Sequence, residues 1–225
     1  MDTTAQHARV AIVGGAGNIA RRLIPLLQDK GIEAVPLARR QEQLDELAAM
    51  GASPRMLDIE ASTTEDFVAA FEGCDAVVFS AGGGGDGNVE RKRTVDLEGS
   101  LKSAEAARAL GIDRFIQVSA IGVDKPADTS RGDAWTAYVA AKRDADASLR
   151  ESSLAWTILR PGRLTDDEPT GQMQLASEVE PGSIPRADVA AVIVACLENA
   201  ATVGYQWELV SGDVPIADAL ARRAR

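Results

Sequence analysis

Short, mostly β-branched runs alternate along this chain with longer amphipathic segments, and this alternation limits the possible folds more than any other feature. The runs predict strands at 9–13, 33–37, 54–57, 76–79, 114–118, 156–159 and 206–210. Helical patterns occur at 18–29, 41–50, 64–72, 89–110, 135–151, 186–199 and 215–223. Strands separated by helices of this length form parallel βαβ units. We therefore expect an α/β fold with a doubly wound parallel sheet of about seven strands.

The strand runs are themselves informative, because VAIV, AVVF, FIQV and WTIL are continuously apolar. Such runs are typical of parallel strands whose two faces are both covered by helices. The chain has 225 residues and contains no repeat, low-complexity linker or break in composition. We expect a single domain over residues 1–225, with a small excursion at about 163–184 on the substrate side.

Composition excludes several kinds of partner and site. The net charge of −10 argues against a nucleic-acid partner, which requires a basic face. No apolar run is long enough for a membrane span. The single histidine, His7, disfavours histidine catalysis and histidine-ligated metal, and we expect no metal site. Cys74 and Cys196 are far apart and form no CxxC motif, which fits a reducing cytoplasm.

The first crossover, VAIVGGAGNIA, passes from a strand through glycines into a helix. Gly14 and Gly17 would let backbone N–H groups approach a pyrophosphate at the helix N-terminus, where Asn18 and Ile19 follow. Ala20 stands where a third glycine would allow close packing of helix on strand. Because the motif opens the first βαβ unit, we interpret the chain as a Rossmann-type NAD(P)-binding domain.

The second and third strand ends bear on which nucleotide is bound. The second reads VPLARRQ and offers Arg39 and Arg40, without the carboxylate usual in NAD-binding crossovers. Guanidinium groups suit a 2′-phosphate, so NADP(H) is favoured over NAD(H). The third ends in LDIE, where Asp58 and Ile59 could meet the adenine. Asp58 could equally be an ordinary polar residue at the end of a strand.

Further along the chain, the carboxyl ends of the predicted fourth and fifth strands carry small and polar residues. The fourth strand opens into FSAGGGGDGN, where Ala81 and Gly82 would lie against the cofactor. Residues 83–87 suggest either a flexible loop or a lid. The fifth strand leaves Ser119 at the carboxyl edge of the sheet. The following helix, AWTAYVAAKRDAD, places Tyr138 and Lys142 one turn apart on one face.

With these motifs the chain resembles the short-chain dehydrogenase/reductase superfamily. Within it, the chain is similar to the atypical group of NAD(P)-binding, NAD-dependent epimerase/dehydratase-like proteins. The likeness extends over nearly the whole chain. It is carried by VGGAGNIA, LDIE, TVDLEGSLKSAEAARALGIDRFIQVSA, YVAAK, LAWTILRPG and PRADVAAVIVACLE.

The resemblance implies specific roles for four residues. Tyr138 would be the general acid/base, Lys142 would lower its pKa and bond the nicotinamide ribose, and Ser119 would orient the substrate oxygen. Asp96, in TVDLEG, stands where the superfamily usually has an asparagine that supports the lysine through water. An aspartate adds charge, which would stabilise Lys142 as an ammonium and could blunt its effect on the tyrosine.

The sixth strand ends in ILRPG, which places Pro161 and Gly162 beside the expected nicotinamide position. The excursion that follows is short, which favours a small carbonyl or quinone-like substrate over a nucleotide sugar. The leading hypothesis is an NADP(H)-dependent oxidoreductase. The alternatives are a non-catalytic NADP(H)-binding redox sensor and an NAD(P)-dependent epimerase or dehydratase. The oligomeric state stays open.

Overall fold

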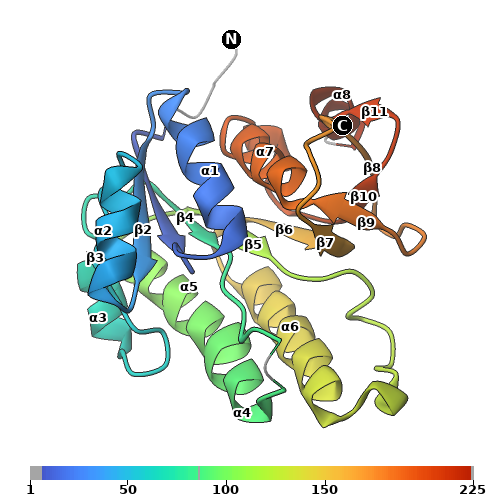
Figure 1. The fold of residues 1–225 in the computed structure, drawn as a ribbon, viewed down its shortest axis with the longest axis horizontal. Coiled ribbons are helices and arrows are strands. Elements are labelled where there is room, and N and C mark those ends of the chain that lie inside the picture. The colour runs from blue at the N-terminus through green and yellow to red at the C-terminus, as the bar shows by residue number, and fades with distance from the viewer. Residues whose placement is uncertain (1–6, 86, 224–225) are drawn as a thin grey trace.

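The computed structural model describes residues 7–85 and 87–223, and its centre is a mainly parallel sheet with helices on both faces (Figure 1). The strand order is β11-β8-β10-β6-β5-β4-β1-β2-β3. These strands are β1 (Arg9–Val13), β2 (Glu33–Ala38), β3 (Arg55–Met56), β4 (Ala76–Phe79), β5 (Arg114–Val118), β6 (Ala155–Pro161), β8 (Gln172–Ala176), β10 (Tyr205–Ser211) and β11 (Val214–Pro215). Two further strands, β7 (Arg163–Thr165) and β9 (Ser183–Pro185), pair only with each other.

The helices form two layers, one on each face of the sheet (Figure 1). One layer contains α1 (Asn18–Gln28), α2 (Gln41–Ala49), α7 (Arg186–Leu197) and α8 (Ile216–Arg223). The opposite layer contains α3 (Thr64–Phe71), α5 (Gly99–Ala109) and α6 (Asp133–Glu151). Short segments complete the chain: α4 (Val89–Arg91), the π-helical turn η1 (Lys92–Glu98), and the 3₁₀ turns η2 (Thr129–Arg131) and η3 (Ala200–Thr202).

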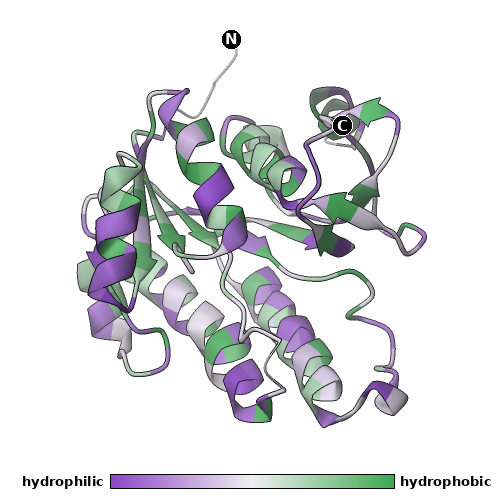
Figure 2. Ribbon diagram, viewed as in Figure 1, coloured by the Kyte–Doolittle hydropathy of each residue, from purple (hydrophilic) through white to green (hydrophobic). Residues whose placement is uncertain are grey.

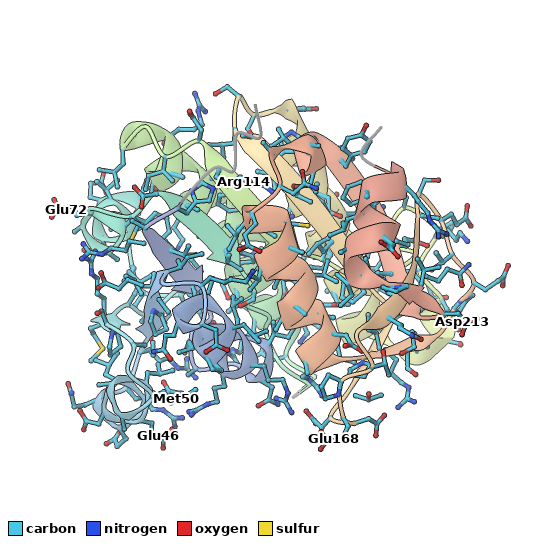
Figure 3. All side chains as sticks on the ribbon, turned by 90° about the horizontal axis from the view of Figure 1, so that it is seen from above. Glu46, Met50, Glu72, Arg114, Glu168 and Asp213 are labelled. Carbon is cyan, nitrogen blue, oxygen red and sulfur yellow. The ribbon has the colours of Figure 1, made fainter. Side chains whose placement is uncertain are left out.

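Each layer has its own apolar core against the sheet. On the first face, Leu23 and Leu27 of α1 pack with Ile193 of α7. On the second, Phe67 and Phe71 of α3 pack with the strand residues. The apolar strands therefore lie inside, while the outer helix faces are polar (Figure 2). Exposed residues such as Glu46, Glu72 and Asp213 mark the rim of the molecule (Figure 3).

The Rossmann-like α/β class predicted from the sequence is confirmed, with a larger sheet than the seven strands expected. β8 and β11 are additions, and β8 runs antiparallel to β10. The excursion at 163–184 supplies β7, β8 and β9. In the described part of the chain no helix is long and apolar enough to cross a membrane.

The strand order places the site. β1 lies in the middle of the parallel region, with β2 on one side and β4 on the other. The crossovers after β1 and β4 leave toward opposite faces, because α1 and α5 lie in different layers. Open α/β sheets bind ligands at such a switch point, outside the carboxyl ends of the strands.

Candidate active site

A cleft of about 290 Å³ opens at this switch point. It is built from residues that follow four neighbouring strands, β1 to β4. Of the residues predicted to bind the cofactor, seven line it: Gly14, Gly17, Arg39, Asp58, Ile59, Ala81 and Gly82. The sequence motifs at separate strand ends thus meet in one hollow, as parallel strand ends in one sheet must.

The glycine turn is shaped for an anion. Gly14 has a φ of +81°, and its carbonyl accepts a hydrogen bond from Gly17 N–H at 2.9 Å. Gly17 is the N-cap of α1, and no side chain caps the helix there. The first turn of α1 also carries no acidic residue. Free N–H groups and the positive end of the helix dipole therefore point toward a site without a negative side chain of its own.

Asn18 and Ile19 begin α1 but do not line this cleft. The Ile19 side chain is buried in the core between α1 and the sheet. Any contact that Ile19 makes with a pyrophosphate would therefore come from its backbone N–H.

The end of β2 carries a small charged cluster rather than the predicted arginine pair. Arg39 lines the cleft and contacts Glu60 Oε2 at 3.4 Å, and Arg91 contacts the same oxygen at 3.2 Å. Thr94 Oγ1 donates to the other carboxylate oxygen at 2.9 Å. Arg40 is exposed at the start of α2, outside the cleft. Arg91 from α4 thus takes the place beside Arg39 that the sequence reasoning gave to Arg40.

Asp58 and Ile59 form the wall beyond β3. The Asp58 carboxylate accepts the N–H of Glu60 at 3.1 Å, which fixes the turn. Lys102 donates to the carbonyls of Ile59 and Ser62, at 2.6 and 2.8 Å. The segment 58–62 is therefore held rigidly against α5, with Ile59 presented to the cleft.

Helix α6 carries a line of polar residues at four-residue intervals: Tyr138, Lys142 and Asp146. Lys142 is only 4% exposed, and its ammonium lies 3.1 Å from Asp96 Oδ1 and 3.1 Å from the carbonyl oxygen of Ala81. Burial is the largest single influence and would lower the pKa of Lys142, but Asp96, Tyr138 and Asp146 together outweigh it and the pKa is raised. Lys142 is therefore a fixed cation at neutral pH. Through Ala81 it touches the wall of the cleft.

Tyr138 lies one turn before this cation. Burial raises the pKa of its phenol, and the nearby Lys142 only partly opposes that effect. The resemblance implied a net lowering of the Tyr138 pKa. In this protein burial has a larger effect than the lysine, and the pKa is raised instead. The tyrosine ring packs against Trp135, with 5.6 Å between ring centroids, and Arg131 covers Trp135 at 3.4 Å from its centroid. The phenol is therefore a protonated group in a partly apolar setting.

Ser119 points into a buried polar network. Its hydroxyl donates to Asp146 Oδ2 at 2.8 Å. The same carboxylate accepts bonds from Gln117 at 2.6 Å and Arg160 at 2.8 Å. Arg160 also forms a bidentate pair with Asp124 in the loop before η2. Because its proton is committed to Asp146, Ser119 would have to turn to reach a substrate.

Asp96 sits in η1, is fully buried and meets two elements at once. Its Oδ2 accepts the N–H of Gly83 at 2.8 Å, and its Oδ1 faces the Lys142 ammonium. Apart from this ion pair, Oδ1 has no hydrogen-bond partner among the described residues, so it keeps acceptor capacity in a buried place. A hydroxyl or a water would satisfy it.

The last pair of predicted residues, Pro161 and Gly162, lies at the end of β6 and does not line the cleft. A Cβ on Gly162 would stand 2.4 Å from the Gly182 carbonyl oxygen. This glycine is therefore required for packing against the segment before β9.

Other reactive groups are remote or inert. Burial raises the pKa of Cys74 to about 11 and that of Cys196 to about 12, so both remain thiols at neutral pH. Within the described residues no group of histidine, cysteine and acidic side chains could hold a metal ion.

Sequence reasoning missed several residues of the site: Ala16, Leu37, Gln43, Glu60, Ser80, Arg91 and Val95 in the cleft, and Gln117, Asp146 and Arg160 beneath it. One signal was present. Asp146 follows Tyr138 and Lys142 at the same four-residue spacing, so a helix places all three on one face. Arg91 and Glu60 gave no such signal, because they are distant in the sequence and meet only in the folded chain.

The residues present fit a bound nicotinamide dinucleotide. The uncapped helix start suits its pyrophosphate, and Arg39 with Arg91 suits a phosphate on the ribose. The buried Lys142 and the unused Asp96 Oδ1 offer a donor and an acceptor to polar hydroxyls at the other end.

Comparison with known proteins agrees with this geometry. The sequence profile of the NAD(P)H-binding family matches residues 14–200. The uncharacterized sugar epimerase YhfK of Bacillus subtilis is 38% identical over 215 residues, covering 95% of this chain and 99% of that protein.

Solved structures give the same result. A Bacillus halodurans protein named for the NAD-dependent epimerase/dehydratase class has a TM-score of 0.87 at 38% identity, covering 96% of this chain and 99% of that one. The oxidoreductase ylbE of Lactococcus lactis has a TM-score of 0.81 at 27% identity, covering 95% of each. The chain therefore belongs to the NAD(P)H-binding family, and the proteins similar to it include ones named as an epimerase and as an oxidoreductase.

Proposed function

We propose that this protein is an NADP(H)-dependent oxidoreductase that acts on a small carbonyl or quinone-like compound, with Tyr138 as the proton donor. The observation that carries the proposal is Lys142. Its buried ammonium lies one helical turn from Tyr138 and touches the carbonyl of Ala81 in the wall of the nucleotide cleft. The acid/base face of α6 and the cofactor cleft therefore share a boundary.

The chemistry divides between cofactor and protein. When bound, the reduced nicotinamide supplies a hydride to the carbonyl carbon of the substrate. Tyr138 gives its phenolic proton to the carbonyl oxygen, which yields an alcohol. Its raised pKa suits this direction, because the phenol keeps its proton until one is needed. Lys142 then stabilises the tyrosinate by its charge.

The preference for NADP(H) rests on Arg39 and Arg91. Both line the cleft, and neither Glu42 nor any other carboxylate of the stretch directly after β2 does. Both arginines contact Glu60, which is 28% exposed at the side chain, at more than 3 Å. A 2′-phosphate would form shorter, charge-assisted bonds with the same guanidinium groups.

The size of the substrate region and the state of the cysteines complete the proposal. The excursion that follows β6 contributes only short strands, β7, β8 and β9, which leaves little protein to enclose a large substrate. A small molecule is therefore the expected partner, rather than nucleic acid or membrane. Buried free thiols at Cys74 and Cys196 fit a reducing cytoplasm.

Epimerase or dehydratase chemistry is the second candidate, because two similar proteins carry such names. It would use the same cleft and the same tyrosine without net consumption of cofactor. A non-catalytic sensor is the third, favoured by the hydrogen bond that engages Ser119 with Asp146.

The test is a panel of aldehydes, ketones, quinones and sugar derivatives incubated with NADPH. The amount of oxidised cofactor and the amount of altered substrate are measured in the same samples. One NADPH consumed for each molecule reduced is expected. Altered substrate with unchanged NADPH would favour the epimerase. Tight NADPH binding with no reaction across the panel would favour the sensor.

A further inference from the structure

The glycine segment 82–85 begins at the cleft, where Gly82 forms part of the wall. Two of its backbone groups are held by side chains of η1. Gly83 N–H donates to Asp96 Oδ2 at 2.8 Å, and Lys92 Nζ donates to the carbonyl oxygen of Gly84. Lys92 is 5% exposed and Asp96 is fully buried. The start of this glycine segment is therefore anchored, although glycines alone suggested a loop free to move.

The two anchoring residues are four positions apart in a π-helical turn. π-helical turns are rare, cost stability and occur mainly at functional sites. Here the turn lets two buried charged side chains of opposite sign reach the same short backbone segment. A regular surface turn would have no need to bury either charge.

The carboxylate of Asp96 has a second partner on another element. Its Oδ1 lies 3.1 Å from Lys142 Nζ on α6. One side chain thus contacts both the wall of the cofactor cleft and the cation beside Tyr138. The other groups that face Lys142 are Tyr138 and Asp146 of α6, the carbonyls of Ala81 and Val118, and the Phe79 ring.

Both neighbours of Asp96 are hydrogen-bond donors, and this explains an aspartate in place of an asparagine. A carboxylate accepts at both oxygens, whereas an amide accepts at one end and donates at the other. An asparagine would turn its NH₂ group toward either Gly83 N–H or the Lys142 ammonium. It could therefore keep one of the two contacts only if its NH₂ group faced the hydrogen-bond donor of the other contact.

We propose that Asp96 is a positioning residue that couples the 82–85 segment to Lys142. Through its two contacts, the position of the cleft wall and the position of the Lys142 ammonium depend on each other. The proposal rests on the function proposed above. It assigns a reason for the departure from asparagine and makes Lys92 the second anchor of the same segment. A carboxylate that served only to fill space would be replaceable by the isosteric amide.

The test compares Asp96→Asn with the wild type in two readouts that need no turnover. Amide hydrogen exchange of Gly83 reports the segment, and NMR titration of the Lys142 side chain reports the cation. We expect either Gly83 exchange about tenfold faster, the effect of losing one hydrogen bond of ordinary strength, or a clearly lowered Lys142 pKa. Glu90→Gln, an exposed isosteric change just upstream, should alter neither.

Lys92→Met tests the anchor at Gly84 separately from the Asp96–Lys142 pair, and it can be used if Asp96→Asn folds poorly. It removes the anchor at Gly84 and leaves the Asp96 pair with Lys142 intact. We expect faster exchange of the Gly83 amide with an unchanged Lys142 pKa.

Unchanged Gly83 exchange together with an unchanged Lys142 titration in Asp96→Asn would overturn the proposal. So would a Lys92→Met protein in which the Gly83 amide exchanges as slowly as in the wild type. Turnover with the best substrate is measured last, where Asp96→Asn should lower kcat more than it raises KM. If no substrate is ever found, exchange and titration still decide the proposal, so its failure and that of the proposed reaction are distinguishable.

Discussion

Gly14 and Gly17 lie three residues apart in one turn, yet the structure predicts opposite consequences for adding a methyl group to each. At Gly14 the φ of +81° disfavours any L side chain, at roughly 1–2 kcal/mol. A Cβ there would also stand 2.7 Å from Ala81 Cα and 2.8 Å from Ala81 N, which are backbone atoms. Forcing that shift costs about 1–3 kcal/mol more. Gly14→Ala should therefore lose about 2–5 kcal/mol of unfolding free energy.

At Gly17 the φ is an ordinary −73°, and a Cβ would meet only the Gly14 carbonyl oxygen, at 3.0 Å. Gly17→Ala should cost about 1 kcal/mol or less, the scale of a changed N-cap. Its methyl group would, however, occupy the approach of a pyrophosphate to the helix start. Overpacking of about 1.4–2.8 kcal/mol would weaken NADPH binding roughly 10- to 100-fold.

The assay is urea unfolding of both variants beside fluorescence titration with NADPH. Gly14→Ala should shift the unfolding midpoint strongly, and Gly17→Ala should shift the affinity while unfolding almost as the wild type. A Gly17→Ala protein that binds NADPH with unchanged affinity would refute the assignment of the pyrophosphate to this turn.

Three further predictions concern charge. Arg39→Gln should weaken NADPH binding roughly 10- to 100-fold, as the loss of a charge-assisted bond of about 1.5–3 kcal/mol implies, and leave NADH binding unchanged. Arg40→Gln, outside the cleft, is the matched control in the same titrations, and equal losses for both cofactors would contradict the assignment. Asp146→Asn should lower the free energy of unfolding in urea by about 1–3 kcal/mol, because buried Arg160 keeps Asp124 but loses its charged bond to Asp146, whereas exposed Asp144→Asn should have little effect. A midpoint for Asp146→Asn equal to that of Asp144→Asn would mean the buried pair adds nothing. Because burial raises the pKa of Tyr138, its phenol stays protonated through neutral pH, so reduction should decline only at pH values above the ordinary range of a tyrosine pKa. A decline near neutral pH in the kcat profile would show that another group controls the proton.

The sequence predicted the parallel sheet well because each strand and helix is locally consistent. β1, β4 and β5 begin and end at the expected residues, since continuous apolar runs flanked by polar residues leave little choice of boundary. β8 and β11 were not predicted. The alternation in QMQLA is short, and its pairing with β10 depends on a chain reversal that local pattern does not encode.

The arrangement of residues was predictable where it depends on one turn or one helix face. Gly14 and Gly17 share the turn after β1, and Tyr138 and Lys142 share a face of α6, while their roles stay predictions. The partners of Arg39 and of Ser119 were not predictable, because they come from residues distant in the chain: Glu60, Arg91 and Asp146. A helix was expected over 89–110, yet residues 92–98 form the π-helical turn η1. Its two buried charged residues, Lys92 and Asp96, bond to residues outside the helix, and helical periodicity does not reveal such partners.

The central claim is that Tyr138 donates the proton in an NADPH-dependent reduction. Its most direct test is the rate of NADPH consumption, with the best substrate of the panel, by wild type and Tyr138→Phe at matched saturation with cofactor. Phenylalanine keeps the ring against Trp135 and removes only the hydroxyl. The account predicts a rate lower by about 10²–10⁴-fold with NADPH affinity unchanged. Equal rates in the two proteins would contradict it.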